Sequence, residues 1–406
     1  MSSITVFSGI FCGETAVIQD VMASTGFKLI SDDDIVKYAA DRCGVPENKI
    51  RRAFTTKTSV FNQFTHEREC AIAHLRCTVA ETLSEDNLII AGFSGLLIPK
   101  TVSHVLRVCL IAEVSSRIQQ AAAAQKLSEK EAVKTIHQDD SHRLKWVDTL
   151  FSQADPWHES LYDMVIPMDK MATYQAGALI EENLLKEVVQ PTEASRQAAK
   201  DFLLASRTEV ALCEAGHNVT VTAANGSVSL SINKQVLMRS RLEEELKSIA
   251  GNVPGVTSVE TRMGKDFHPS NIYRKHSVET PSKVLLVDDE REFVQTLSER
   301  LLLRDMGSAV AYDGESALNV VREDDPEVII IDLKMPDVDG IEVLKRIKKV
   351  RPEIEVIVLT GHGSESDKKL CMALGAFGYL QKPVDINELS EAIKKAYEKI
   401  HSNRVP

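Results

Sequence analysis

The chain has 406 residues, of which 43% are hydrophobic and 26% charged, a composition typical of a globular protein. A chain of this length is expected to form two or three domains. The formal net charge of −11 argues against a broad electrostatic surface for nucleic acid, so we expect no nucleic-acid partner.

Seven cysteines are scattered along the chain and none forms a C-x-x-C pair, so neither a zinc site nor a redox motif is predicted. The odd count in a chain of this length predicts reduced thiols, as in a cytoplasmic protein. The first residues lack the basic, apolar and small-residue pattern of a signal peptide. Apolar runs stay below the roughly 18 residues that span a bilayer, so we expect a cytoplasmic protein with no transmembrane segment.

The first predicted domain covers residues 1–195. Its strand-like runs include Ile4–Phe7, Leu88–Ala91 and Val105–Ile111, with helix-like stretches between them. Strands that alternate with helices predict an α/β domain built on a parallel sheet.

The segment Ser8–Thr15 follows the first strand and has the outline of a phosphate-binding loop, Gly-x4-Gly-Lys-Ser/Thr. Two positions depart from that outline, since Ser8 stands in place of the first glycine and Glu14 in place of the lysine. The loop pattern works by offering backbone N–H groups and a cation to phosphates, and a glutamate there repels a triphosphate. Taken alone, the segment is more often an ordinary strand–turn–helix connection.

Four further stretches carry a resemblance: Phe27–Asp34, Val105–Arg117, Asp139–Arg143 and Tyr162–Ile166. Together they resemble the cytidylate-kinase-like proteins over roughly residues 1–185. The resemblance implies a P-loop-kinase-like parallel sheet and a nucleotide ligand. Its candidate nucleotide-binding residues are Gly9, Gly13, Thr15, Asp33, Arg117 and Arg143.

One further departure bears on activity. The family commonly shows Gly-Arg after the strand that here ends in Ala91-Gly92, and this chain has Phe93. Losing a loop cation typically costs several kcal/mol of transition-state stabilisation. We therefore predict a degenerate kinase domain without enzymatic output. The alternatives are an active cytidylate-type nucleoside monophosphate kinase regulated by the C-terminal domain, and arginines that are ordinary solvated helix charges.

The second predicted domain covers residues 208–264. An Asn225-Gly226 pair separates two alternating runs, Asn218–Ala223 and Ser227–Ile232, and predicts a hairpin because both turn positions favour positive φ. A helix over Lys234–Ile249 and a strand over Thr257–Arg262 are expected to follow.

This second stretch resembles the BON domain, a small α+β module, through Asn225–Leu230 and Val253–Val259. The resemblance implies a binding module without catalytic residues. A structural spacer is the alternative. Residues 265–282, with two prolines and no periodic pattern, are predicted to form an exposed linker.

The third predicted domain covers residues 283–402, with five strands separated by helices and a last helix that starts near Asp385. The strands are Val284–Val287, Ala309–Tyr312, Val328–Ile331, Val356–Leu359 and Phe377–Leu380. Polar residues follow four of them, and in an open α/β sheet these ends line one crevice. They are Asp288, Asp289, Asp332, Thr360 and Lys382.

This set has the chemistry of phosphoryl transfer to a carboxylate. Asp289 and Asp332 can bind Mg²⁺ together with the backbone carbonyl of Lys334, since Mg²⁺ prefers oxygen ligands. Asp288 helps through its charge or a bridging water. Lys382 can pair with a phosphoryl oxygen, and the Thr360 hydroxyl can donate to another. Each motif alone is weak, because an aspartate after a strand is often a helix cap.

The stretch Asp332–Gly340 is close to the phosphoacceptor loop of the response-regulator receiver family, which residues 283–402 resemble throughout. The resemblance implies a flavodoxin-like (βα)5 fold with Asp332 as phosphoacceptor and bound Mg²⁺. It also implies that Tyr379 is a switch residue that turns inward with Thr360. Alternatively, Tyr379 is merely a half-buried strand aromatic.

From these features we predict a two-component or phosphorelay response regulator. Its partner is a sensor histidine kinase or a phosphotransfer protein. The expected output does not bind DNA and acts through the kinase-like and BON-like regions. A homodimeric scaffold is a further alternative.

Overall fold

A computed structural model describes residues 2–235, 239–272, 281–336, 338–361 and 363–402, without the side chains of 234–235 and 265–272. The described chain forms two compact units. Unit 1 comprises Met1–Thr58, Arg68–Glu214 and Asn218–Tyr273, and unit 2 comprises Ser59–Glu67, Ala215–His217 and Arg274–Pro406.

Unit 1 is built on a parallel sheet of order β2-β3-β1-β4-β5. The strands are β1 (Ser3–Ser8), β2 (Lys28–Ser31), β3 (Leu88–Ala91), β4 (Val105–Ile111) and β5 (Met164–Pro167). Every residue of β1 is buried, as expected of a central parallel strand covered on both faces. The prediction of a parallel α/β sheet for this region is confirmed.

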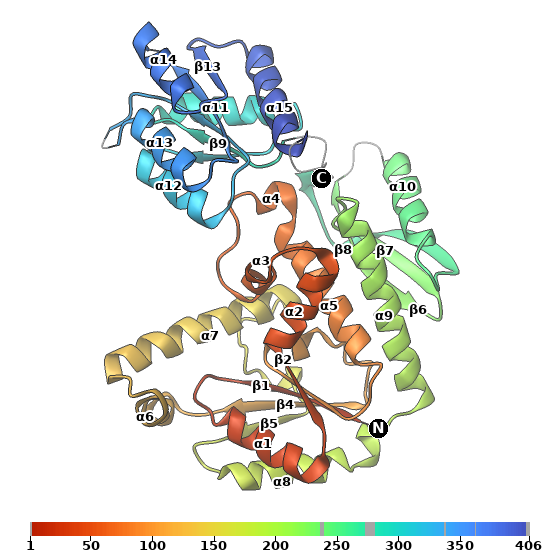
Figure 1. Ribbon diagram of the computed structural model, residues 1–406. Coiled ribbons are helices and arrows are strands. Elements are labelled where there is room, and N and C mark those ends of the chain that lie inside the picture. The colour runs from red at the N-terminus through yellow and green to blue at the C-terminus, as the bar shows by residue number, and fades with distance from the viewer. Residues whose placement is uncertain (1, 236–238, 273–280, 337, 362, 403–406) are drawn as a thin grey trace. The chain divides into compact units, whose positions relative to one another are not determined.

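Helices cover both faces of this sheet (Figure 1). They are α1 (Glu14–Thr25), α2 (Asp32–Cys43), α3 (Glu47–Arg51), α5 (Glu67–Thr82), α6 (Val114–Gln125), α7 (Glu129–Phe151), α8 (Thr173–Leu184) and α9 (Glu193–Glu214). On one face, α1 and α8 pack against Ile4 and Val6. On the other, α2, α5 and α7 pack against Phe7. Because side chains alternate along a strand, the short run of β1 serves both cores.

The last part of unit 1 is a three-stranded sheet of order β6-β7-β8 beside helix α10 (Arg239–Gly251). The strands are β6 (Thr220–Ala224), β7 (Ser227–Gln235) and β8 (Ser258–Ile272). The predicted hairpin is present, with φ of 50° at Asn225 and 84° at Gly226. Leu212 of α9 and Leu246 of α10 are buried in the core of this sheet.

Several boundaries differ from the sequence prediction. The helix expected over Lys234–Ile249 is α10, which begins at Arg239 and ends at Gly251, because Lys234 still belongs to strand β7. Strand β8 was expected to end at Arg262 but continues to Ile272, so residues 265–272 are not a linker without secondary structure. Of the remaining predicted linker residues, 273–280 lie outside the described residues, whereas Pro281 and Ser282 are buried and not exposed as predicted. Helix α9 runs through both 195 and 208, the positions chosen as domain limits, because its apolar residues serve the large sheet first and the small sheet afterwards.

The prediction that all cysteines are reduced thiols is wrong for two of them. Cys70 on α5 and Cys213 on α9 form a disulfide across 143 residues, with Cα atoms 5.6 Å apart. The other five are free, and of these only Cys43 is not fully buried. The prediction failed because an odd number of cysteines excludes only complete pairing and still allows one disulfide. The spacing of cysteines in the sequence does not show which helices pack side by side.

Unit 2 contains a parallel sheet of order β10-β9-β11-β12-β13. The strands are β9 (Val284–Val287), β10 (Ser308–Ala311), β11 (Val328–Ile331), β12 (Glu355–Thr360) and β13 (Gly378–Gln381). This strand order is that of the flavodoxin-like fold. The predicted fold of residues 283–402 is confirmed, although Asp337 of the predicted loop lies outside the described residues.

The helices of unit 2 cover both faces of its sheet (Figure 1). They are α11 (Arg291–Leu302), α12 (Gly314–Glu323), α13 (Gly340–Val350), α14 (Glu365–Ala373) and α15 (Ile386–Ser402), and the short helix α4 (Asn62–Thr65) also belongs to unit 2. One core holds residues of α12, α13 and α14, and the other holds residues of α11 and α15. Within the described residues, none of the helices of either unit is long and apolar enough to cross a bilayer.

Candidate functional sites

The carboxyl ends of the parallel strands in unit 2 bring the predicted receiver residues together. Asp288 follows β9, Asp332 follows β11 and Lys382 follows β13. One oxygen from each of Asp288, Asp289 and Asp332 lies within 4.8 Å of the others. Burial is the main cause that raises the pKa of Asp288 above its ordinary value. Three converging carboxylates fit a hard divalent cation such as Mg²⁺. The Lys334 carbonyl stays a prediction.

Lys382 lies among these acids. Its Nζ is 2.7 Å from Asp288 Oδ2, 3.2 Å from Asp332 Oδ2 and 3.1 Å from Glu290 Oε1. Burial acts to lower the pKa of Lys382, but its hydrogen bond to Asp288 and the nearby negative charges outweigh burial and raise that pKa. The ammonium group therefore stays charged and is positioned beside the Asp332 carboxylate.

Asp332 is fixed by its own loop. Only 7% of the residue is exposed, and the backbone N–H of Leu333 donates to its Oδ1 over 2.6 Å. The backbone carbonyl of Asp332 passes so close to Gly340 that a side chain at Gly340 would collide with it. Position 340 therefore requires glycine, and helix α13 starts there with Asp339 as its cap.

The two predicted switch residues also meet. Thr360 is 1% exposed at the end of β12. Tyr379 lies inward, with its hydroxyl beside Gly363, where a Cβ atom would collide with it. That hydroxyl is buried and has no hydrogen-bond partner among the described residues. The structure therefore brings the pair together, and their switching role stays a prediction.

A second group of polar residues surrounds the loop between β1 and α1 in unit 1. Gly13 adopts a left-handed conformation with φ of 77° just before α1. Ser8 donates a hydrogen bond to Glu14 over 2.7 Å. Burial raises the pKa of Glu14 although that hydrogen bond and the charge of Arg143 act to lower it. The Glu14 side chain thus folds back onto the loop. The lysine of the loop pattern would instead offer a cation to a phosphate.

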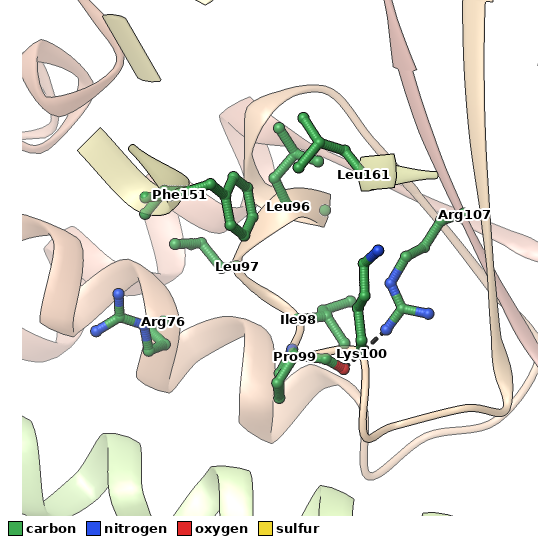
Figure 2. A pocket seen from close by; sticks show the side chains of 11 residues that line it. Arg76, Leu96, Leu97, Ile98, Pro99, Lys100, Arg107, Phe151 and Leu161 are labelled. Atoms are coloured by element: carbon green, nitrogen blue, oxygen red, sulfur yellow. Dashed lines mark hydrogen bonds between the residues drawn. The ribbon is translucent and has the colours of Figure 1, made fainter. Parts of the chain in front are cut away.

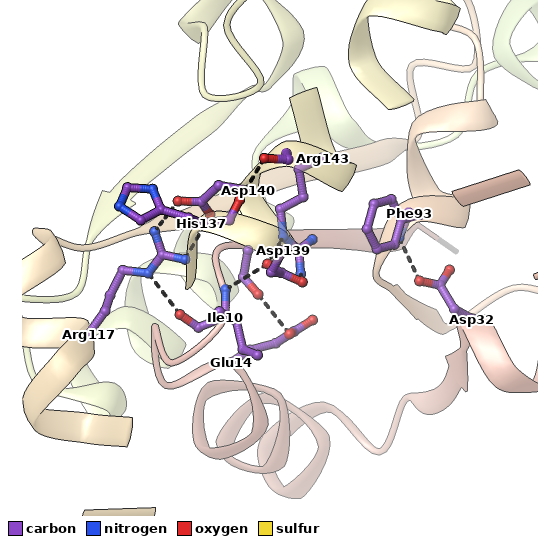
Figure 3. A network of polar contacts seen from close by, with 11 residues as sticks. Ile10, Glu14, Asp32, Phe93, Arg117, His137, Asp139, Asp140 and Arg143 are labelled. Atoms are coloured by element: carbon purple, nitrogen blue, oxygen red, sulfur yellow. Dashed lines mark hydrogen bonds and ion pairs between the residues drawn. The ribbon is translucent and has the colours of Figure 1, made fainter. Parts of the chain in front are cut away.

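The arginines near this loop are paired with carboxylates from α7 (Figure 3). Arg117 makes two hydrogen bonds to Asp140, of 2.9 and 2.8 Å, and a third of 2.9 Å to the carbonyl of Ile10. Arg143 pairs with Asp139 over 2.7 Å, and the N–H of Ile10 donates to the same carboxylate over 3.4 Å. Carboxylates of α7 therefore engage both arginines and one backbone N–H of the loop.

Phe93 occupies the position where the resemblance leads one to expect an arginine. The Arg143 guanidinium lies 4.8 Å from the centre of the Phe93 ring and 5.0 Å from that of Phe7. Trp146 donates to the Phe93 carbonyl over 2.9 Å. Position 93 is thus part of an aromatic cluster that carries Arg143 on its ring faces.

Not every predicted residue lies at this loop. Thr15 is exposed on α1, and Asp33 is exposed and paired with Arg51. The neighbouring Asp32 is half-buried, and it accepts hydrogen bonds of 2.8 Å from the backbone of both Phe93 and Ser94. Burial raises the pKa of Asp32.

Sequence reasoning missed Asp32, Asp139 and Asp140 as site residues. The four-residue spacing from Asp139 to Arg143 was a usable signal for a helical ion pair. No comparable signal separates Asp32 from Asp33, since both stand in one acidic turn.

A cavity of about 180 Å³ lies elsewhere in unit 1, between apolar residues and three cations (Figure 2). The cations are already engaged: Arg76 with Glu209, Lys100 with the Ser160 carbonyl, and Arg107 with the carbonyls of Val105, Pro99 and Val102. Because Arg107 holds the surrounding loop, we assign this cavity to packing rather than to ligand binding.

The flavodoxin-like sheet with its acidic trio and neighbouring lysine defines an α/β protein that can place a hard cation and an anion at one crevice. Comparison with known proteins agrees. Residues 284–394 match the model for the response regulator receiver domain, and residues 3–170 match the model for the cytidylate kinase-like family.

Among known proteins, the chain is 36% identical over 121 residues to sporulation initiation phosphotransferase F of Bacillus subtilis, covering 30% of this chain and 97% of that protein. It is 38% identical over 120 residues to the transcriptional regulatory protein CpxR of Escherichia coli, covering 30% of this chain and 51% of that protein. A solved receiver domain from Clostridium thermocellum shares 35% identity, covering 30% of this chain and 97% of that one, with a TM-score of 0.29.

The chain therefore belongs to the response regulator receiver domain family. It spans about half the length of CpxR.

Proposed function

We propose that this protein is a two-component or phosphorelay response regulator that takes a phosphoryl group on Asp332. The observation that carries the proposal is the position of Lys382, which lies 3.2 Å from Asp332 beside the three converging carboxylates. The donor is a phosphohistidine of a sensor histidine kinase or of a phosphotransfer protein. Neither the donor nor the output follows from the receiver relatives alone.

In the proposed reaction an Asp332 carboxylate oxygen attacks the phosphorus atom. The bond between phosphorus and the donor nitrogen breaks, and the electron pair of that bond returns to the imidazole. Asp288, Asp289 and Asp332, with the Lys334 carbonyl, would hold Mg²⁺, and the bound cation would offset the charge of the incoming phosphoryl group. Lys382 then exchanges part of its pairing with Asp288 for a phosphoryl oxygen, and Thr360 and Tyr379 move together as the switch.

The test is labelling of the full chain with a small phosphodonor and Mg²⁺. The wild type should form an acid-stable, base-labile phosphoprotein, and Asp332→Asn should not, because an amide is not a nucleophile of this kind. Asp305→Asn is the matched control, since Asp305 is exposed and has φ of 59°, which asparagine tolerates. Equal labelling of the wild type and Asp332→Asn contradicts the proposal.

We propose further that the output is binding by a degenerate kinase-like region, residues 1–195, and a BON-like region, residues 208–264. The support is Glu14 in the loop, together with the engagement of Arg117 and Arg143 by carboxylates of α7. A chain without its loop cation lacks the group that stabilises a transferring phosphoryl group. We place this protein in the cytoplasm, with DNA-independent output.

The second candidate is an active cytidylate-type kinase. One observation favours a nucleotide ligand: Nη1 of Arg143 is buried and has no hydrogen-bond partner among the described residues. The two candidates differ in ADP release from ATP in the presence of CMP or other nucleoside monophosphates. We expect no turnover. Turnover that disappears in Arg143→Gln but persists in Lys145→Gln, an exposed position on the same helix, would establish the kinase instead.

A further inference from the structure

The disulfide between Cys70 and Cys213 ties α9 to α5 at the point where α9 ends. The apolar contacts of α9 with the large sheet come from its first half and include Phe202. Its later residue Leu212 belongs to the core of the β6–β8 sheet. The bridge therefore attaches the end of α9 that carries the small sheet to the helix layer of the large one.

Other contacts between these two helices near the bridge are polar. Arg76 pairs with Glu209, Arg207 lies 3.3 Å from Glu81, and His74 lies 3.8 Å from Glu214. The carboxylates of Glu214 and Glu81 are 60% and 30% exposed. Ion pairs in contact with water hold helices together only weakly. The covalent bond is thus the strong connection at this end of α9.

The two bridged cysteines are less buried than most of the free cysteines. Cys70 and Cys213 are both half-buried. By contrast, Cys12, Cys77, Cys109 and Cys371 are buried. Burial raises the pKa of Cys12 to about 11 and that of Cys109 to about 12, which suppresses their reactive thiolates.

We propose that Cys70 and Cys213 are a reversible redox modification site that latches α9 to α5. Oxidation proceeds by exchange with a small disulfide such as oxidised glutathione. One cysteine thiolate attacks a sulfur of that disulfide, forms a mixed disulfide and releases one small thiol. The second cysteine thiolate then attacks the protein sulfur of the mixed disulfide and releases the other small thiol. The protein loses two electrons and two protons, and the small disulfide becomes two thiols.

The first test counts free thiols in the full chain after equilibration with reduced and oxidised glutathione at set ratios. Thiols are trapped by alkylation under denaturing conditions and counted by intact mass. Of seven cysteines, the wild type should label all seven when reduced and five when oxidised, since one bridge removes two. Cys43→Ser, at the remaining half-buried thiol, should still lose two labels and change from six to four. Cys70→Ser and Cys213→Ser should label six at every ratio.

The second test measures hydrogen exchange of the backbone amides in β6 and β7. Exchange should be faster in the reduced wild type than in the oxidised one, and Cys213→Ser should match the reduced state at every ratio. Seven labels under all conditions, or five labels that excess reduced glutathione cannot increase, would each overturn the proposal. Exchange rates that do not depend on the redox state would also overturn the latch.

Discussion

The chain carries two polar sites at the carboxyl ends of parallel strands, and they balance charge in opposite ways. In the receiver site Lys382 stands between Asp288 and Asp332, with Asp289 nearby, so acids outnumber cations. At the loop of unit 1, Arg117 and Arg143 are each bound to a carboxylate of α7. The receiver site has an excess of acids, whereas at the loop each of the two arginines is matched by a carboxylate.

The comparison of the two sites shows that the strand order determines where a site lies, whereas its side chains determine what the site can bind. Both sheets direct loops to one crevice, as expected of open parallel sheets. In the receiver crevice, the half-buried Lys382 places a cation beside Asp332, the proposed phosphoacceptor. A glutamate and two engaged arginines leave the other with little attraction for one.

The largest expected effect comes from removing the ammonium group of Lys382 in the receiver site. Lys382→Ala should lower the rate of Asp332 labelling by about 100- to 1,000-fold, because one preorganised group at a developing charge typically contributes about that factor. The initial rate with a small phosphodonor and Mg²⁺ measures it. Lys394→Ala, exposed on α15, is the control and should label at the wild-type rate. A Lys382→Ala rate near that of the wild type would remove the contrast between the two sites.

A smaller effect is expected from removing an internal anion at the loop. Asp139→Asn frees Arg143 and the Ile10 N–H from a carboxylate, and should tighten binding of inorganic pyrophosphate by about tenfold, or about 1.4 kcal/mol. Titration calorimetry on the full chain measures it. Asp148→Asn, on the same helix and 3.3 Å from Lys145, is the control. Unchanged or weaker binding would mean that Asp139 does not occupy an anion position.

The smallest effect concerns Glu14 and pH. Its raised pKa means that the folded chain holds this proton more tightly than the unfolded chain does. The Glu14 contribution to stability is therefore present below the unfolded value, near 4.5, and is lost as pH rises toward the folded value. Glu14→Gln lacks this loss, so its free energy of unfolding should rise relative to the wild type over that window.

Calorimetric unfolding at several pH values measures the Glu14 difference. The exposed Glu182→Gln on α8 serves as the matched control and should show no such trend. A difference between Glu14→Gln and the wild type that is constant with pH would mean that Glu14 is not buried against the loop.

Much of the fold could be predicted from apolar runs. The predicted strand Ala309–Tyr312 is one residue away from the observed β10, and Val284–Val287 coincides with β9. Strands covered on both faces are almost wholly apolar and therefore stand out from the helices. The end of β8 could not be placed in this way, because its residues beyond Arg262 form no continuous apolar run and include Gly264 and Pro269.

The receiver site could be predicted because each residue follows directly from a strand end. The loop site of unit 1 could be predicted only in outline. Glu14 and Phe93 were recognised as departures, but the pairing of Arg117 with Asp140 depends on how α6 and α7 pack, and no local pattern fixes that packing. The disulfide between Cys70 and Cys213 was not predicted because it likewise depends on how two helices, α5 and α9, pack.

The aromatic cluster around Phe93 also has an evolutionary consequence. An arginine at position 93 would give up the stacking on Arg143 and place a second guanidinium beside the first. A lysine at position 14 would lose the Ser8 hydrogen bond while Asp139 still engages Arg143. Each single substitution leaves the other contacts in place and costs packing or pairing before the loop gains an available cation. The present arrangement is therefore entrenched, and a lineage could leave it only through several coordinated substitutions.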